Sequence, residues 1–160
     1  MTPAVDQLAA LSVPHRILSY PHDSAAASYG TEAAEALGLD PEAVFKTLLA
    51  QLSGASDGST LVVALVPVTG KLDLKALARA AGAKKAEMAK PEIAERTTGY
   101  VVGGISPFGQ KKKLPTYVDE TVELLDTVHV SAGRRGLEIS LAPDDLIAVL
   151  QAAVAPIAAD

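Results

Sequence analysis

The chain contains no cysteine and no tryptophan, and aromatic residues make up only 4% of its 160 residues. The absence of cysteine excludes disulfides, thiolate metal sites and a cysteine nucleophile. Because hydrophobic residues still make up 49% of the chain, the core must be built mainly from Leu, Val, Ile and Ala. No charged leader with a long apolar run opens the chain, and the longest apolar stretch, 61–68, is far too short to span a membrane. We therefore expect a cytoplasmic protein that folds as a single domain over residues 1–160.

The chain is also short of positive charge, with a formal net charge of −5 at pH 7. This balance argues against a general nucleic-acid coating protein, whose surface is usually broadly basic. It does not exclude local contacts with nucleic acid, because such binding depends on where the positively charged side chains cluster. Two basic patches stand out, namely Lys111, Lys112 and Lys113, and Arg134 with Arg135.

Hydrophobic periodicity and turn residues predict an alternation of helices and short strands. Helices are predicted at 3–11, from Thr31 to the residues before Gly38, at 73–81, from Pro91 onward and at 143–154. Strands are predicted at 16–20, 44–52, 60–68, 84–88, 100–102, 116–118, 127–131 and 137–141. Short hairpins and helical crossovers alternate between them. This pattern predicts a mixed α/β (α+β) fold, with a curled mixed β-sheet that forms a partial barrel flanked by helices.

Lys46 is an anomaly within the predicted strand 44–52. Its side chain shares one face with Leu48 and Ala50, while the other face carries Phe45 and Leu49. Neither face looks solvated, and a buried ammonium group needs a compensating partner. Two interpretations remain open from the pattern alone: the lysine snorkels to water from the end of the strand, or it offers a cation to an anionic or carbonyl group in a cleft.

Two glycine-rich segments are candidates for contact with a ligand. Gly103-Gly104 follows a predicted strand, and paired glycines allow a ligand to approach backbone N–H groups. Gly133 lies in a predicted hairpin, 132–136, that also carries both arginines, a combination that suits phosphate contact. A simple wide turn and an exposed hairpin tip explain the same two patterns equally well.

The three histidines show no metal-ligand spacing and none is adjacent to a serine nucleophile. The sequence therefore predicts no metal site, no cofactor and no serine triad.

Three segments occur in a distinctive order: 40–48 (DPEAVFKTL), 99–107 (GYVVGGISP) and 131–137 (SAGRRGL). Together they resemble the YbaK/EbsC family of free-standing aminoacyl-tRNA editing proteins, which is related to the editing domain of bacterial prolyl-tRNA synthetase. The resemblance extends over nearly the whole chain and implies a curled α/β barrel-like fold. It also implies trans-editing, with the Cys-tRNA(Pro) deacylases, which can also act on Cys-tRNA(Cys), as the most similar members.

The resemblance also implies which residues form the site. Lys46, Gly103 and Gly104 are the expected catalytic group, and the lysine positions the substrate while the glycine amides stabilise an oxyanion. The expected substrate-binding residues are Tyr20, Tyr29, Ser106, Pro107, Ser131 and Gly133. The expected tRNA phosphate contacts are Lys111, Lys112, Lys113, Arg134 and Arg135. Ala132 and Glu138 depart from residues common in the family, and these changes affect the fine shape of the pocket.

The expected partners are an aminoacyl-tRNA, tRNA(Pro) in particular, and prolyl-tRNA synthetase as a recruiting partner. A cysteinyl substrate carries its own thiol, which can attack its own carbonyl in a chain without a nucleophile. Three alternatives remain: a non-catalytic module that binds tRNA or a synthetase, a deacylase for another small amino acid such as alanine, and an enzyme for a small phosphorylated ligand.

Overall fold

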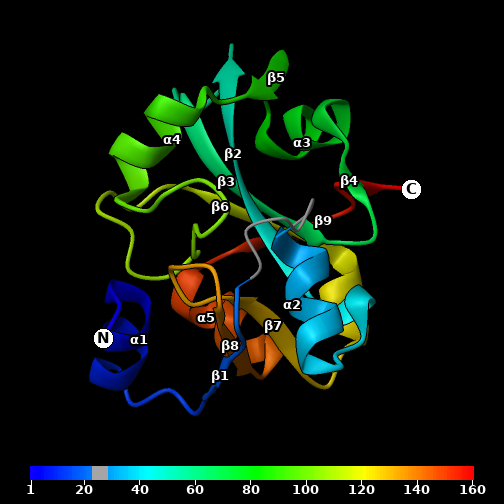
Figure 1. Ribbon diagram of the computed structural model, residues 1–160. Helices are drawn as coiled ribbons and strands as arrows, with labels where there is room; N and C mark the ends of the chain where they lie inside the picture. The colour runs from blue at the N-terminus through cyan, green and yellow to red at the C-terminus, as the bar shows by residue number, and fades with distance from the viewer. Residues whose placement is uncertain (23–28) are drawn as a thin grey trace.

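A computed structural model describes residues 1–22 and 29–160 of the chain (Figure 1). Its α-helices are α1 (Pro3–Ala10), α2 (Tyr29–Leu37), α3 (Leu74–Ala81), α4 (Pro91–Thr98) and α5 (Pro143–Leu150), and its 3₁₀ helices are η1 (Pro41–Ala43) and η2 (Glu120–Leu124). Its strands are β1 (Arg16–Ser19), β2 (Phe45–Ser53), β3 (Leu61–Pro67), β4 (Lys71–Leu72), β5 (Lys85–Met88), β6 (Thr116–Asp119), β7 (Val128–Ser131), β8 (Leu137–Leu141), β9 (Ala153–Ala155) and β10 (Ala158–Ala159). In the described part, no helix has the length and apolar character needed to cross a membrane.

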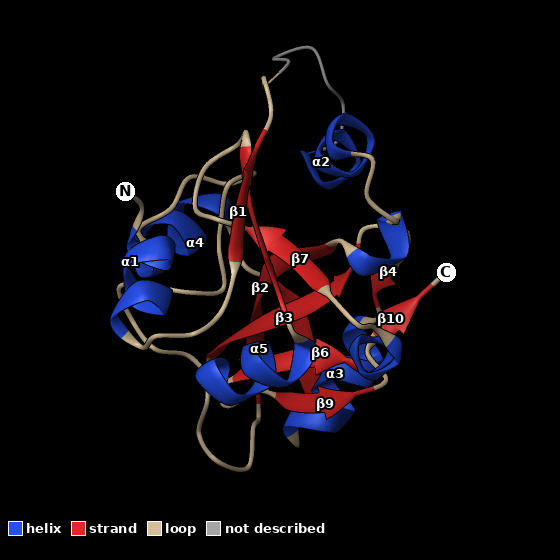
Figure 2. Ribbon diagram, turned by 90° about the horizontal axis from the view of Figure 1, so that it is seen from below, coloured by secondary structure: helices blue, strands red, loops and turns tan. Residues whose placement is uncertain are grey.

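The strands form a mixed, curled sheet system. The larger sheet has the order β5-β2-β3-β6-β9, in which β2 and β3 are antiparallel while β3, β6 and β9 run parallel. A second, antiparallel sheet has the order β1-β8-β7, and β4 pairs separately with β10. A single parallel bridge between Val44 and His129 joins the start of β2 to β7. The sheets therefore curl toward each other without closing, with helices around them (Figure 2), and the predicted partial barrel is confirmed.

The central hairpin, β2 and β3, is buried on both of its faces. Phe45 and Leu49 pack into one hydrophobic cluster with residues of β7, β8 and α5. Ala50 and Leu52 alternate with them and pack into a second cluster, together with Leu77 of α3. Because side chains alternate along a strand, apolar residues at consecutive positions place this hairpin between two cores.

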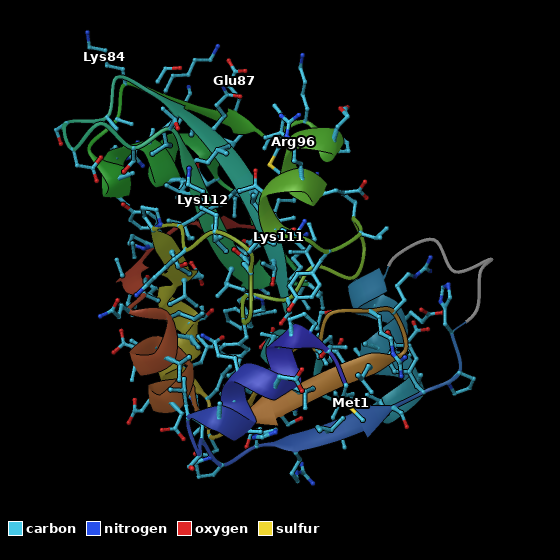
Figure 3. The ribbon with its side chains drawn as sticks, turned by 90° about the vertical axis from the view of Figure 1, so that its left-hand side faces the viewer. Met1, Lys84, Glu87, Arg96, Lys111 and Lys112 are labelled. Carbon is cyan, nitrogen blue, oxygen red and sulfur yellow. The ribbon has the colours of Figure 1, made fainter. Side chains whose placement is uncertain are left out.

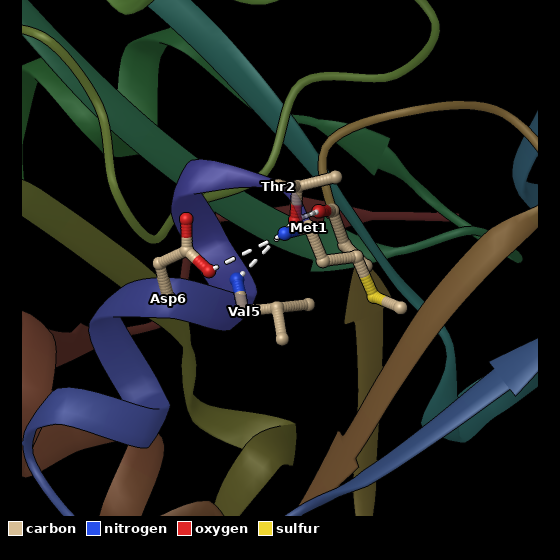
Figure 4. A network of polar contacts seen from close by, with 5 residues as sticks. Met1, Thr2, Val5 and Asp6 are labelled. Atoms are coloured by element: carbon tan, nitrogen blue, oxygen red, sulfur yellow. Dashed lines mark hydrogen bonds and ion pairs between the residues drawn. The ribbon is translucent and has the colours of Figure 1, made fainter.

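Local capping fixes where the helices begin and end. Asp73 accepts a hydrogen bond from the Ala76 amide at 3.0 Å before α3, and Gly82 ends that helix at a positive φ of 66°. Thr2 caps α1 by accepting from the Val5 amide at 3.3 Å. Its hydroxyl also donates to the Ala132 carbonyl at 2.5 Å. The start of α1 is therefore attached to the loop between β7 and β8. Figure 4 shows the contact between Thr2 and Val5 and, next to it, the ion pair between the Met1 amino group and Asp6.

Three predicted elements are wrong in detail. Residues 100–102 form no strand, because the Tyr100 amide donates to Thr98 Oγ1 and the Tyr100 hydroxyl donates to the Phe108 carbonyl, which hold the segment in a loop. The last helix ends at Leu150 instead of residue 154, since Gln151 adopts a left-handed conformation and the chain continues into β9. The helix expected from Thr31 begins earlier, at Tyr29.

Candidate functional site

A pocket of about 440 Å³ opens between the start of β2, the loop that follows α4 and the β7–β8 hairpin. Most of its wall is apolar, and several charged side chains from separate segments reach it. It is lined by Tyr20, Val44, Phe45, Lys46, Thr47, Leu48, Leu49, Met88, Ala89, Pro91, Ala94, Val102, Gly103, Ile105, Ser131, Arg134, Arg135 and Glu138. Its size falls within the range of small-molecule binding sites.

Lys46 lies on the β2 wall of this pocket, opposite Val66 of β3 in the sheet register. Its position one residue into the strand leaves it half-buried between apolar neighbours. Burial lowers the pKa of its ammonium group, and the nearby charge of Lys71 lowers it further. The two effects disfavour the free cation, so an anionic or strongly dipolar ligand would stabilise it.

The glycine loop lies across the pocket from β2. Gly103 lines the pocket at a positive φ of 95°. Gly104 packs on the hairpin instead, where an added Cβ would lie 3.0 Å from the Arg134 Cα. Its amide donates to the Val101 carbonyl at 2.8 Å. In this conformation the Gly104 amide is engaged within its own turn, so of the two predicted glycines only Gly103 lines the pocket.

The β7–β8 hairpin brings Ser131, Arg134 and Arg135 to the pocket. The Ser131 hydroxyl accepts a hydrogen bond from the Gly133 amide at 3.1 Å. The guanidinium group of Arg135 lies 3.8 Å from the Glu32 carboxylate, while Arg134 is exposed. Two guanidinium groups at the pocket therefore give it positive charge on the hairpin side.

Other predicted residues lie outside the pocket wall. Ser106 is fully buried, and its hydroxyl accepts from the Phe108 amide at 3.3 Å. Pro107 lines a smaller cavity beside α1 and α5. Gly133 packs on Tyr100, where an added Cβ would lie 2.7 Å from the ring. Tyr29 begins α2, and its side chain lies outside the described residues.

The three consecutive lysines also lie away from the pocket. Lys111 and Lys112 are exposed on the loop that passes α4, on the same face as Arg96 (Figure 3). Lys113 donates to the Gln151 side chain at the end of α5 and lines the smaller cavity. Of the five basic residues predicted to contact phosphate, only the two arginines reach the pocket.

Tyr20 lines the pocket where β1 ends, and its amide donates to the Gly136 carbonyl at 3.0 Å. Burial raises the pKa of its hydroxyl, and the carboxyl groups of Glu138 and Glu32 raise it further. The Tyr20 hydroxyl therefore keeps its proton at neutral pH and can donate a hydrogen bond in the pocket.

Thr47 is a pocket residue that the sequence analysis did not select, and Glu138 is one that it named only as a departure from the family that affects the shape of the pocket. Both have a buried side-chain oxygen without a hydrogen-bond partner among the described residues, Oε2 of Glu138 and Oγ1 of Thr47. Burial raises the pKa of Glu138 to about 8. A polar residue at every second position is typical of a solvent-facing strand edge, so the sequence contained no signal that this carboxyl is buried.

The described residues contain no group of three or more His, Asp or Glu side chains that could hold a metal ion. Among the pocket-lining residues of the described part there is also no histidine that could activate Ser131. The polar groups at hand can therefore bind and polarise a ligand, while none of them forms a serine–histidine pair.

Comparison with known proteins identifies the family. The model of the aminoacyl-tRNA editing domain matches residues 23–149. A protein of Enterococcus faecalis named "Putative Cys-tRNA(Pro)/Cys-tRNA(Cys) deacylase EbsC" is 45% identical over 116 residues, which cover 72% of this chain and 68% of the relative.

Solved structures share the fold. One described as "a putative trans-editing enzyme for prolyl tRNA synthetase" has a TM-score of 0.82 at 24% identity and covers 100% of this chain and 99% of its own. The hypothetical protein APE2540 has a TM-score of 0.85 at 22% identity, with 99% and 100% covered. The family match spans most of the chain, includes every residue that lines the pocket except Tyr20, and confirms the resemblance found in the sequence. The chain belongs to the aminoacyl-tRNA editing domain family.

Proposed function

We propose that this chain is a free-standing aminoacyl-tRNA deacylase that removes cysteine from mischarged Cys-tRNA(Pro), and that it also accepts Cys-tRNA(Cys). One observation carries the proposal: Lys46, Gly103 and Ser131, from three segments far apart in the sequence, line one pocket in a chain of the editing family. The name of the Enterococcus faecalis relative supports the choice of amino acid and tRNA. The pocket is large enough for an aminoacyl group and part of the terminal ribose.

The substrate supplies the nucleophile in the proposed mechanism. The chain has no cysteine, and Ser131 has no histidine beside it among the described pocket residues. The cysteinyl thiol attacks its own ester carbonyl, which forms a C–S bond and a tetrahedral oxyanion. The C–O bond to the ribose then breaks, and the ribose oxygen takes the proton that the thiol released. The products are deacylated tRNA and a cysteine thiolactone, which water hydrolyses.

Lys46 positions the substrate and stabilises charge in this reaction. As a compact cation on the β2 wall, it can hold the ester carbonyl or the phosphate of the terminal nucleotide. The Gly103 amide, across the pocket, is the proposed donor to the oxyanion. An ammonium group that donates to developing negative charge stabilises the transition state more than the ground state, which is the requirement for catalysis.

Amino-acid choice depends on small differences in the apolar wall. A pocket separates side chains that differ by one methylene-sized group by only about 1–3 kcal/mol. Alanine and serine esters can therefore enter, but they lack the thiol that the proposed mechanism requires. We propose tRNA(Pro) as the physiological tRNA and prolyl-tRNA synthetase as the partner that presents it, because few cations surround the pocket.

The test follows ester cleavage of Cys-, Ala- and Pro-charged tRNA(Pro) by the wild type and by Lys46→Ala. We expect rapid loss of cysteine only, and a decrease of at least about a hundredfold in kcat/KM for the variant, since one preorganised donor contributes about this much. Lys75→Ala removes an exposed lysine from α3 and is the matched control, with activity expected to be unchanged.

Each contrary result has a definite meaning. If the wild type cleaves none of the three esters, the proposed function is wrong, and the module that only binds tRNA becomes the better reading. Efficient cleavage of Ala-tRNA(Pro) would contradict the thiol mechanism and favour an alanine-specific deacylase. Wild-type activity in a folded Lys46→Ala variant would remove the lysine from the site.

A further inference from the structure

Glu138 is a buried acid with one carboxyl oxygen, Oε2, that has no hydrogen-bond partner among the described residues. It lies in the middle strand of the β1-β8-β7 sheet, paired with Leu18 on one side and Ser131 on the other. The residue is only 6% exposed, it lines the pocket, and its Oε2 has no hydrogen-bond partner among the described residues. It is also the only acidic residue among the described residues that line this pocket.

The position is unfavourable for a carboxylate in the empty pocket. Burial alone raises the pKa of Glu138 to about 8, with no opposing effect from a neighbouring cation. A buried acid without a partner destabilises a fold, and such a group is commonly found where a ligand completes its interactions.

The charges of the pocket divide into two kinds. Lys46, Arg134 and Arg135 offer donors to phosphate or carbonyl oxygens. Glu138 offers the opposite, an acceptor for a cation. An aminoacyl ester of tRNA has one cationic group at its reacting end, the α-ammonium, with three N–H donors and an ordinary pKa of about 8. When it leaves water, this group needs an acceptor.

We propose that Glu138 is the subsite that binds the α-ammonium group of the substrate, so that the enzyme selects esters with a free α-amino group over N-acylated ones. This inference rests on the proposed function. The carboxyl and the amino group share one proton with similar affinity, so a hydrogen bond joins them whether the proton lies on oxygen or on nitrogen. Peptidyl and formylated esters lack the cation, and Glu138 would then remain unsatisfied.

Binding can be measured without turnover. The probe is the cysteinyl amide of 3′-amino-3′-deoxyadenosine, which cannot be cleaved as an ester. The comparison compound is the 3-mercaptopropionyl amide of the same nucleoside, which lacks only the α-amino group. By calorimetry we expect the wild type to bind the cysteinyl amide about ten- to a hundredfold more tightly than the des-amino compound, the range for hydrogen bonds to charged groups. In Glu138→Gln this preference should fall to about threefold or less.

The same comparison with tRNA(Pro) carrying cysteinyl and 3-mercaptopropionyl esters measures kcat/KM. Glu138→Gln should decrease cleavage of the cysteinyl ester about ten- to a hundredfold and leave the des-amino ester nearly unchanged. Glu138→Asp keeps the charge and should retain part of the preference. Thermal unfolding of both variants verifies that they fold.

The outcomes separate the two proposals. An equal decrease with both esters would mean that Glu138 acts on the thiol or supports the fold, and the ammonium subsite would be wrong. Equal or undetectable binding of both amides by the wild type would also overturn it. If the preference in binding depends on Glu138 but no charged tRNA is cleaved, the subsite stands and the proposed function fails.

Discussion

Lys46 and Glu138 bring opposite charges to one apolar pocket, and burial disfavours the charged form of both side chains. It lowers the pKa of the lysine and raises that of the glutamate, so that each group is shifted toward its neutral form. A ligand with an anionic or carbonyl group near Lys46 and a cation near Glu138 would restore both charges. The terminal aminoacyl-adenosine of a charged tRNA has this arrangement.

The raised pKa of Glu138 makes stability dependent on pH. Between the ordinary value of 4.5 and about 8, the folded chain holds a proton that the unfolded chain has released. Stability from this residue is therefore fully present below about pH 4.5 and is lost as the pH rises through 8. Glu138→Gln cannot ionise, so it should become increasingly more stable than the wild type from about pH 5 to about pH 8.5, by at most about 5 kcal/mol.

Urea unfolding across this pH range measures the difference in the free energy of unfolding. The exposed Glu123→Gln is the matched control and should follow the wild-type profile. Parallel profiles for the wild type and Glu138→Gln would show that the carboxyl does not stay protonated in the folded state.

At the scale of elements, local signals predicted most of the fold. Asp73 and Gly82 mark the two ends of α3, which was predicted at 73–81, because capping depends on residues a few positions apart. The apolar segments of β2 and β3 predicted their hairpin, which the structure confirms.

Long-range contacts explain what the sequence did not predict. The segment that begins at Tyr100 has strand-forming residues but forms a loop. The Tyr100 hydroxyl donates to the Phe108 carbonyl, and the Tyr100 ring packs against Gly133 of the distant β7–β8 hairpin. The helix α5 ends just before Gln151, which adopts a left-handed conformation. The sequence did not predict this end, because glycine is the residue that usually marks a left-handed helix terminus. The motif around Lys46 predicted a residue that lines the pocket, whereas no motif predicted the burial of Glu138, which depends on the strands that flank β8.

Asp119 joins the end of β6 to the C-terminal segment. Its Oδ1 accepts from the amides of Ile157 and Ala158 at 3.0 and 2.9 Å, and its Oδ2 accepts from the Thr121 amide and hydroxyl. The residue is only 3% exposed. Asp119→Ala leaves three amides without this acceptor and should decrease the free energy of unfolding by about 2–4 kcal/mol.

Urea unfolding tests this prediction, with the exposed Glu123→Ala as the control that should change stability by less than about 0.5 kcal/mol. A similarly small effect of Asp119→Ala would mean that water replaces the carboxylate at this junction. Asp119→Asn should also destabilise the fold, since an amide can supply only one acceptor oxygen.

At the scale of the whole molecule, a chain of net charge −5 must recognise a polyanion. The overall field repels tRNA, so attraction has to come from local cations. Arg134 lies at the pocket, while Lys111 and Lys112 are exposed on the same face as Arg96, which Figure 3 shows. This distribution gives few phosphate contacts, which is why we propose that a synthetase helps to present the substrate.

The last prediction concerns the salt dependence of binding to uncharged tRNA(Pro). Each phosphate contact contributes about 0.7–0.9 to the slope of log affinity against log salt. Replacing both Lys111 and Lys112 with alanine should therefore weaken binding at low salt and decrease the slope by about 1.5. The control replaces Lys84 and Lys85, which have the same total charge. Lys84 and Glu87 lie at the far edge of this face (Figure 3), and Lys85 pairs with Glu87 at 2.7 Å. Because neither control lysine is among the predicted phosphate contacts, the slope of the control variant should equal that of the wild type. Equal slopes for both double variants would place the tRNA elsewhere on the molecule.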